Sequence, residues 1–356
     1  MSFKDILETM IKRGASDFFI RAGSPLRARI RTEVKVLDDY TFTAKEVDRI
    51  IAEMTDDKKR NLLQKNRSCE FAVAYDERWR FRTAIFYQRN TLVIVIRKID
   101  LNISSFEELN LPAKVLQNFC RQRRGLILLT GITGSGKSTT IASMIEFINQ
   151  NFGRHILTVE EPIEFTFKDK KSMINQREIG VDVFSYADAL KQFALHSPDV
   201  IYIGNIKDAQ TCHAALTAAE TGVLVLSTTH TVNATSTVER IVNFFPPQQH
   251  PLIFNQLSRL LKGVVSLRLI PRIDVEALIP AYEVMVLSPT ISGLIRENKL
   301  WEAPKYIATG DIYGMKSFNQ CLMELIEEKK ISAQIALEHS DKKEELDLKL
   351  RHKDII

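Results

Sequence analysis

Cysteine is scarce in this sequence, and the spacing of the few cysteines excludes two common uses of the residue. The 356 residues include four cysteines, Cys69, Cys120, Cys212 and Cys321. They lie far apart and form neither a C-x-x-C pair nor a Cys/His cluster, so the sequence indicates no disulfide framework and no zinc site of ordinary ligand spacing. We expect reduced cysteines that pack in the interior of the protein.

Long hydrophobic runs are also missing. The longest candidates, Leu92–Ile96 and Leu126–Thr130, have the length of strands, whereas a membrane-spanning helix needs about 18 or more apolar residues in succession. The first residues, MSFKDILETMIKRG, place charges where a signal peptide would need an unbroken apolar stretch. We therefore expect a cytosolic protein, and docking on a membrane complex stays open.

A strong excess of charge of one sign is absent as well. Lysine and arginine number 49 and aspartate and glutamate 44, while charged residues make up 26% of the chain and hydrophobic residues 45%. This composition is typical of a folded globular protein, and its mildly basic balance favours an ordinary solvated surface over a nucleic-acid footprint. The length predicts two globular units, and we find neither an internal repeat nor a low-complexity segment.

The pattern of residues 1–97 predicts an α+β domain. Apolar side chains in residues 3–14 recur with the period of a helix. Thr43 and Glu46 have the spacing of a capping box, which opens a second helix that extends to about Met54. Strand-like runs lie between and after these helices, so the predicted order is helix, strands, helix, strands.

The second half of the chain has a different texture. Residues 98–115 are polar and are predicted to connect the two domains. In residues 116–289, short buried apolar runs alternate with amphipathic segments, which indicates a parallel sheet covered by helices. Residues 290–356 are predicted to be mainly helical. The fold class is therefore α/β.

The most informative motif is GITGSGKST, residues 131–139. It matches G-x-x-x-x-G-K-[ST] at every fixed position and lies between a predicted buried strand and a predicted helix, which is the context of a phosphate-binding P-loop. Its glycines let the backbone curve around an anion, and the helix N-terminus adds positive potential. Lys137 is placed for the β- and γ-phosphates and Ser138 for Mg²⁺. The predicted nucleotide-binding residues are Gly131, Thr133, Gly134, Ser135, Gly136, Lys137, Ser138 and Thr139.

The P-loop predicts ATP and Mg²⁺ as cofactors but no particular activity, because kinases, GTPases, helicases and transport motors share it. The sequence contains no NKxD-type motif for recognition of guanine. An ATP-driven motor is therefore favoured over a GTPase.

A series of motifs after the P-loop carries a family resemblance. In chain order they are ILTVEEPIEF, INQREIGVD, SPDVIYIGNIKD, AAETGVLVLSTTHT and RIVNFFP. Together with SDFFIRAGSP and RFRTAIFYQR, they make the whole chain resemble the type IV pilus retraction ATPases, the PilT and PilU class of the secretion ATPase superfamily. The C-terminal run FNQCLMELIEEKKISAQIALEHSDKKEELDLKLR is more similar to the PilU branch than to the PilT branch.

The resemblance implies both a fold and a set of partners. The fold is a PAS-like α+β domain at the N-terminus, followed by a RecA-like P-loop ATPase domain with C-terminal helices. The assembly is a homo-oligomer, a hexameric ring in which each N-terminal domain packs on the next subunit's nucleotide domain. ATP turnover in the ring drives pilus disassembly and twitching. The implied location is cytoplasmic and peripheral at the inner membrane, with a paralogous retraction ATPase and the inner-membrane pilus platform protein as partners and no nucleic acid expected.

Five further site residues follow from the resemblance, position by position. Glu160 stands where the family keeps the glutamate that orients or activates the attacking water, a task that needs a carboxylate beside the γ-phosphate. Glu164 ends the same acidic box and joins the catalytic candidates. His230 matches the histidine that senses the γ-phosphate. Arg82 and Arg97 match family arginines that reach toward bound nucleotide, for which a planar guanidinium is suited.

The chain departs from the family pattern at several positions. The Walker B segment of the family ends G-E-x-R-D, but this chain has Asn205 in place of that glutamate. An amide neither brings negative charge to a magnesium shell nor accepts a proton as a base. In addition, Leu195 replaces an arginine, Val223 replaces a histidine, Glu161 stands where aspartate is usual, and Thr290–Glu297 (TISGLIRE) lacks one arginine of the corresponding PilT motif.

These changes leave the phosphate-binding residues in place and remove groups that would position magnesium and water. Losing one well-placed acid–base group costs about 10²–10⁴ in rate, and losing charge stabilisation at the metal adds to that cost. We therefore expect an ATP-binding retraction subunit with weak turnover, or a non-hydrolysing subunit coupled to an active paralogue. The alternative is that Asn205 is tolerated in a working ATPase, with Asp208, Glu160 or Glu161 compensating.

Other interpretations stay open at this point. An assembly-type secretion ATPase would usually carry extra N-terminal domains and often a four-cysteine metal motif. A RecA-like nucleic-acid motor draws on the basic clusters Arg121–Arg124 and Lys168–Lys171, but no aromatic stacking platform accompanies them. Asp341–Lys353 has the pattern of one amphipathic helix, either packed on its own domain or docking a partner, and packing is favoured.

Overall fold

The computed structural model describes residues 2–30, 33–76, 78–100, 102–193, 195–353 and 355. These residues form two compact units. The first comprises Met1–Asn102 and the short segment Pro162–Thr166, and the second comprises Ile103–Glu161 and Phe167–Ile356. Within the described ranges, no helix has both the length and the hydrophobicity needed to cross a membrane.

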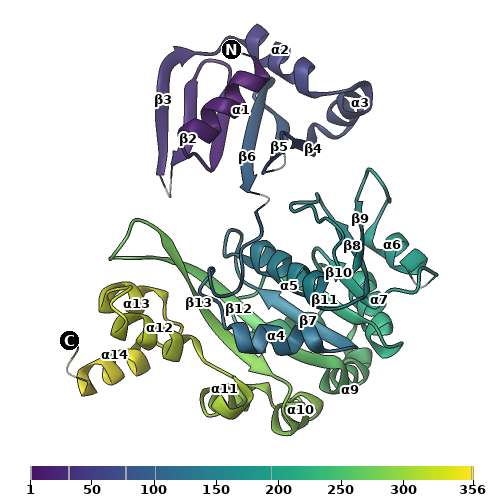
Figure 1. The fold of residues 1–356 in the computed structure, drawn as a ribbon, viewed down its shortest axis with the longest axis vertical. Helices are drawn as coiled ribbons and strands as arrows, with labels where there is room; N and C mark the ends of the chain where they lie inside the picture. The colour runs from purple at the N-terminus through teal and green to yellow at the C-terminus, as the bar shows by residue number, and fades with distance from the viewer. Residues whose placement is uncertain are drawn as a thin grey trace. The chain divides into compact units, whose positions relative to one another are not determined.

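An antiparallel sheet of six strands forms the first unit, in the order β3-β2-β1-β6-β5-β4 (Figure 1). Its strands are β1 (Asp17–Arg21), β2 (Pro25–Ile30), β3 (Glu33–Thr41), β4 (Ser68–Ala74), β5 (Trp79–Gln88) and β6 (Thr91–Asp100), and its helices are α1 (Phe3–Lys12), α2 (Ala44–Met54) and α3 (Asp57–Asn66). The core contains fully buried side chains from β1, β5 and β6, among them Phe18, Phe81 and Ile94. This is the α+β unit that the sequence pattern predicts.

The predicted capping box at Thr43 is confirmed. The Thr43 hydroxyl accepts a hydrogen bond from the Glu46 backbone N–H, and the Glu46 carboxylate accepts one from the Thr43 N–H at 2.8 Å. The helix predicted in residues 3–14 is α1, which ends at Lys12. Reciprocal caps of this kind satisfy backbone donors that have no partner within the helix.

A sheet of seven strands lies at the centre of the second unit, in the order β13-β12-β7-β11-β10-β8-β9 (Figure 1). The strands are β7 (Gly125–Thr130), β8 (His155–Glu160), β9 (Met173–Glu178), β10 (Val200–Ile203), β11 (Leu224–Thr229), β12 (Leu261–Pro271) and β13 (Leu278–Val286). All neighbouring pairs are parallel except β12 and β13. Every residue of β7 is buried, because Leu126 and Leu128 belong to one apolar cluster and Ile127 and Leu129 to another.

Helices surround this sheet. They are α4 (Ala113–Arg121), α5 (Lys137–Asn151), α6 (Tyr186–Phe193), α7 (Ala209–Glu220), α8 (Ala234–Val242), α9 (His250–Leu260), α10 (Pro289–Arg296) and α11 (Ala303–Ala308), with short 3₁₀ turns at η1 (Pro247–Gln249), η2 (Leu300–Glu302) and η3 (Asp311–Tyr313). Because parallel strands bury both faces, the sheet needs such cover, and the alternation of apolar runs and amphipathic segments predicted it.

Three helices close the chain: α12 (Phe318–Glu327), α13 (Ala333–His339) and α14 (Lys343–His352). They share an apolar cluster with the β12–β13 hairpin, to which Ile270 and Ile279 contribute. Leu346 and Leu350 of α14 are fully buried there. The C-terminal amphipathic helix thus packs on its own domain, which confirms the favoured alternative.

The boundary predicted at residue 97 lies inside β6. The strand continues to Asp100, because Asp100 pairs with Trp79 and Ile99 pairs with Arg80 on β5. Further along the predicted connection, Phe106 and Leu111 are buried in the core of the second unit. Apolar side chains in a polar segment therefore anchor much of residues 103–115 to the second unit.

The cysteines are packing residues, as expected. All four are buried and free. Burial raises the pKa of Cys212 and of Cys321 to about 12, so these thiols stay protonated at neutral pH.

Candidate functional site

Four of the predicted site features meet at one edge of the second sheet. The P-loop follows β7, His230 follows β11, Asn205 lies just after β10, and Glu160 is the last residue of β8. These strands are consecutive neighbours in the order β7-β11-β10-β8 and run parallel (Figure 1). The carboxyl edge of a parallel sheet is where ligands bind in open α/β folds.

The glycines of the P-loop adopt conformations that other residues avoid. Gly131, Gly134 and Gly136 have φ angles of +147°, +80° and +95°. A Cβ atom added at Gly131 would lie 2.4 Å from the Ser135 hydroxyl oxygen and 2.5 Å from the Leu267 carbonyl oxygen. The curvature of the loop therefore requires glycine at position 131.

The loop has the properties of an anion cradle. Lys137 is buried, and its ammonium donates hydrogen bonds to the carbonyls of Gly131 at 2.7 Å and Ile132 at 2.8 Å. Among the described residues, the buried Ser135 hydroxyl has no hydrogen-bond partner, and no side chain of this part of the protein caps the N-terminus of α5 at Gly136. A buried polar atom and open helix N–H groups beside a lysine fit the phosphates of a nucleotide.

His230 lies close enough to Lys137 to feel its charge. Burial and the Lys137 ammonium lower the pKa of His230, in that order of importance. A lowered pKa keeps the imidazole neutral at pH 7. The residue after it is fixed to the strand that precedes the P-loop, because the Thr130 hydroxyl donates to the Thr231 carbonyl and accepts from the Thr231 N–H at 3.2 Å.

Glu160 is a buried carboxylate with 6% of its surface exposed. It accepts hydrogen bonds from the Thr158 hydroxyl at 2.7 Å and the Gln176 amide at 3.4 Å. The turn after β10 passes close by, since a Cβ atom at Gly204 would lie 3.3 Å from the Glu160 Cα. Glu160 and the residue that follows Gly204 are therefore neighbours.

That residue is Asn205, and its buried side-chain amide oxygen finds no hydrogen-bond partner in the part of the chain that the structure describes. The carboxylates nearest in sequence have other roles: Glu161 pairs with the Lys207 ammonium at 3.1 Å, and Asp208 caps α7 by accepting the Thr211 N–H at 2.8 Å. Glu160 is the buried carboxylate at the end of β8, the strand next to β10. The partly buried Ser138 at the start of α5 and the vacant acceptor on Asn205 fit a magnesium ion held mainly by phosphate oxygens and water.

The predicted residues Arg82, Arg97 and Glu164 belong to the first unit. Arg82 and Arg97 are directly opposite each other on β5 and β6, so their side chains share one face of the sheet. Arg82 pairs with Glu70 at 2.8 Å and with Glu164 at 3.5 Å, and Arg97 pairs with the buried Asp17 at 2.7 Å. Acidic partners thus offset two adjacent positive charges.

Sequence reasoning missed two residues next to the site. Thr130 holds the residue that follows His230, and its position directly before Gly131 was the available signal. Glu283 on β13 accepts a hydrogen bond from the Ala234 N–H at 2.8 Å, at the start of α8. Burial raises the pKa of Glu283 to about 7. Its 49-residue separation from Ala234 leaves no local signal.

Comparison with known proteins places this site in a family. Residues 1–346 match the family described as Type II/IV secretion system protein. The chain belongs to this family. It is 34% identical over 351 residues to the type IV pilus ATPase PilU of Pseudomonas aeruginosa, covering 99% of this chain and 92% of that protein. It is 36% identical over 338 residues to the type IV pilus retraction ATPase PilT of the same species, covering 95% and 98%.

A solved structure with bound nucleotide is similar to nearly the whole chain. A crystal structure of the pilus retraction motor PilT with bound ADP superimposes with a TM-score of 0.88 at 40% identity, covering 98% of this chain and 99% of that one. The predicted family is confirmed, and so is the α/β fold with an N-terminal domain and a RecA-like ATPase domain. The family and this neighbour support an ATPase that binds nucleotide. The PilU match covers the larger share of the chain, whereas the PilT match has the higher identity, so the predicted PilU branch stays a prediction.

Proposed function

We propose that this chain is an ATP-binding motor subunit of the type IV pilus machinery that promotes pilus retraction and twitching. The observation that carries the proposal is the anion cradle at Gly131–Thr139, which lies at the same sheet edge as Glu160, Asn205 and His230. The similarity to PilU and PilT over nearly the whole chain supports the cellular role.

ATP and Mg²⁺ are the proposed ligands. Lys137 would turn from the loop carbonyls toward the β- and γ-phosphates, and the Ser135 hydroxyl and the N–H groups at the start of α5 would donate to phosphate oxygens. Ser138 and the Asn205 amide oxygen would face the metal and its water shell. Bound Mg²⁺ supplies charge neutralisation of the phosphates.

Glu160 is the proposed group that orients the attacking water. It is a buried carboxylate that accepts hydrogen bonds from two neutral donors, the Thr158 hydroxyl and the Gln176 amide. Neutral His230 would donate to the γ-phosphate. Arg82 and Arg97 are proposed to add positive charge from an N-terminal domain, after exchange of their present acidic partners.

We further propose that turnover is weak because Asn205 replaces a carboxylate. The other acids of the Walker B turn pair with Lys207 and cap α7, and Glu178, opposite Glu160 on β9, lies on the side of β8 away from β10. In the cell the chain would then act as a subunit coupled to an active paralogous retraction ATPase. The proposed assembly is a hexamer at the cytoplasmic side of the inner membrane, in contact with the pilus platform protein.

The test of nucleotide binding compares the native chain with Lys137→Ala by titration with ATP in the presence of Mg²⁺. Loss of the ammonium is expected to weaken ATP binding by about 100-fold, since a hydrogen-bonded charge of this kind contributes up to about 3 kcal/mol. Lys171→Ala removes an exposed lysine elsewhere in the same unit and should leave affinity unchanged.

Cells whose chain carries Lys137→Ala are expected to twitch poorly. Equal ATP affinity of native chain and Lys137→Ala would contradict the nucleotide site, whereas lost binding with unchanged twitching would contradict the motor role.

A further inference from the structure

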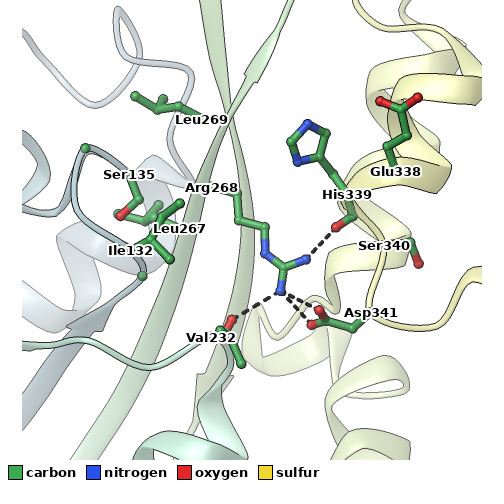
Figure 2. A pocket seen from close by; sticks show the side chains of 12 residues that line it. Ile132, Ser135, Val232, Leu267, Arg268, Leu269, Glu338, His339, Ser340 and Asp341 are labelled. Atoms are coloured by element: carbon green, nitrogen blue, oxygen red, sulfur yellow. Dashed lines mark hydrogen bonds and ion pairs between the residues drawn. The ribbon is translucent and has the colours of Figure 1, made fainter.

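Arg268 on β12 joins the C-terminal helices to the nucleotide-binding edge of the sheet (Figure 2). One terminal nitrogen, Nη2, donates to both carboxylate oxygens of Asp341 at 2.7 Å and to the Val232 carbonyl at 3.3 Å. The other, Nη1, donates to the His339 carbonyl. The guanidinium also stacks 4.0 Å from the centre of the Phe318 ring. The Arg268 side chain, which extends from β12, therefore contacts α12, the α13–α14 connection and the segment after β11.

A cavity of about 290 Å³ lies beside this cluster. Ile132 and Ser135 of the P-loop form part of its wall, and Val232, Arg268 and the α13–α14 connection form another part (Figure 2). The α13–α14 connection and the P-loop thus line the same cavity. The apolar cluster that the C-terminal helices share with the β12–β13 hairpin brings Asp341 to Arg268, although the two lie 73 residues apart in sequence.

The Val232 carbonyl belongs to the loop that carries His230, residues 230–233, here called the His230 loop. The Thr231 N–H donates to the Thr130 hydroxyl on β7, and the Thr231 hydroxyl lies 2.7 Å from the Thr237 hydroxyl on α8. One side of this loop is therefore tied to β7 and α8. The contact from Arg268 ties the other side to the α13–α14 connection. The loop is therefore held between the P-loop strand and the C-terminal helices.

Asp341 helps to hold Arg268 in this position by matching its charge. The Arg268 side chain is 17% exposed and that of Asp341 is 43% exposed, and the buried Glu283 carboxylate also interacts with Arg268. Loss of the Asp341 charge leaves the mostly buried guanidinium less fully compensated and favours its rearrangement. A displaced Arg268 would release the Val232 carbonyl and with it one of the restraints on the His230 loop.

We propose that Arg268 and Asp341 are positioning residues that fix the His230 loop against the P-loop, so that the C-terminal helices set how strongly the site prefers ATP over ADP. The inference rests on the proposed contact of His230 with the γ-phosphate. Since ADP lacks that phosphate, a loosened His230 loop lowers ATP affinity and leaves ADP affinity nearly unchanged.

The experiment measures Kd for ATP and for ADP with Mg²⁺ in the native chain and in Asp341→Asn, which removes the charge but keeps the shape. The ratio Kd(ADP)/Kd(ATP) is expected to fall by about 10-fold, within the range of ordinary coupling between sites. Asp274→Asn is the control: Asp274 pairs with Arg272, which lies just after β12, through Nε at 2.8 Å and Nη2 at 2.6 Å, so it too removes one carboxylate charge from an arginine. It should leave the ratio unchanged.

A double-mutant cycle then asks whether Asp341 acts through His230. In a His230→Ala background, Asp341→Asn should change the ratio by less than about twofold, because the group that it positions is gone. Thermal unfolding of each variant without nucleotide confirms that it is folded at the temperature of the titrations.

Three results would overturn the inference. They are an unchanged ratio in Asp341→Asn, an equal fall in Asp274→Asn, and a full effect of Asp341→Asn in the His230→Ala background. In each case a normal loss of binding in Lys137→Ala would leave the proposed function intact. If Lys137→Ala binds ATP like the native chain, the proposed function fails and the inference fails with it.

Discussion

The candidate nucleotide site has a phosphate side and a water side. The two differ in how many functional groups of the family pattern this chain keeps. On the phosphate side, the P-loop has its glycines in positive-φ conformations and a buried Lys137. It also has a buried Ser135 hydroxyl to which none of the described residues is hydrogen-bonded. On the water side, the turn after β10 presents an amide at Asn205, and Glu161 and Asp208 are paired with other groups. Glu160 is the carboxylate retained there.

This difference is possible because the two sides come from different strand ends. The phosphate side follows β7, whereas Glu160 ends β8 and Asn205 follows β10, and both strands lie on the far side of β11 from β7. We therefore expect a substitution after β10 to change the proposed metal and water environment and to leave the P-loop backbone in place. On this proposal, ATP binding and turnover are separable.

The largest expected effect comes from breaking the water side at Glu160. In the Asn205→Glu background, Glu160→Gln should lower the rate of ATP hydrolysis by about 10²–10⁴, because a positioned base contributes that much. ATP affinity should stay within about threefold, since the P-loop is untouched. Steady-state hydrolysis and ATP titration measure the two quantities.

The neighbouring Glu161→Gln serves as control for Glu160→Gln. The Glu161 carboxylate is half exposed and pairs with Lys207, so its loss should change the rate little. Equal rates for Glu160→Gln and its parent would show that Glu160 does not orient the water.

A smaller effect is expected from breaking the phosphate side at Gly131. The Cβ atom of Gly131→Ala meets the Ser135 hydroxyl and the Leu267 carbonyl below 3.0 Å, at a φ of +147°. Overpacking of this kind costs about 1–3 kcal/mol, so ATP binding should weaken by about 5- to 100-fold. Titration with ATP measures the change.

Gly293→Ala on α10 is the matched glycine substitution, because nothing lies within 4 Å of its added Cβ atom. It should keep native affinity and gain up to about 1 kcal/mol of helix stability. Native ATP affinity in Gly131→Ala would contradict the cradle geometry.

The smallest effect concerns the free energy of unfolding. It comes from Glu283, which accepts a hydrogen bond from the Ala234 N–H at the start of α8. Its pKa is raised to about 7, first by burial, against an ordinary value of 4.5. Between these values the folded chain holds a proton that the unfolded chain releases, so stability falls as pH rises from 4.5 to 7 and the penalty is complete above 7. Glu283→Gln removes this penalty, which is at most about 3 kcal/mol.

The measurement for Glu283 is Tm of native chain and Glu283→Gln between pH 5 and pH 8. The difference in favour of the variant should grow with pH and level off above about pH 7. A difference that stays constant over this range would mean that Glu283 ionises with its ordinary pKa.

The sequence predicted those parts of the molecule that local rules govern. The P-loop depends on adjacent residues, and so does the capping box at Thr43, which the structure reproduces. The alternation of buried runs from Leu126 onward predicted the parallel sheet. By contrast, α3 escaped notice because it is almost entirely polar and buries only Leu63, so it has no apolar period to detect.

Contacts between distant segments could not be predicted in the same way. Asp341 meets Arg268 across 73 residues and Glu283 meets Ala234 across 49, and each of these charged residues reads as surface in the sequence. The continuation of β6 to Asp100 likewise depends on pairing with β5 rather than on the residues themselves. Such contacts are set by tertiary packing, which the hydrophobic pattern and the intrinsic propensities of the residues do not reveal.

The most direct test of the central claim is steady-state ATP hydrolysis with Mg²⁺ by the native chain, Asn205→Glu and Lys137→Ala, with ATP binding measured in each. We predict that the native chain binds ATP, that its rate stays close to that of Lys137→Ala, and that Asn205→Glu gains about 10²-fold or more. A native rate of about 1 s⁻¹ or above, typical of a working enzyme, together with no gain in Asn205→Glu, would contradict the account. The chain would then be a retraction motor in its own right, with Asn205 tolerated.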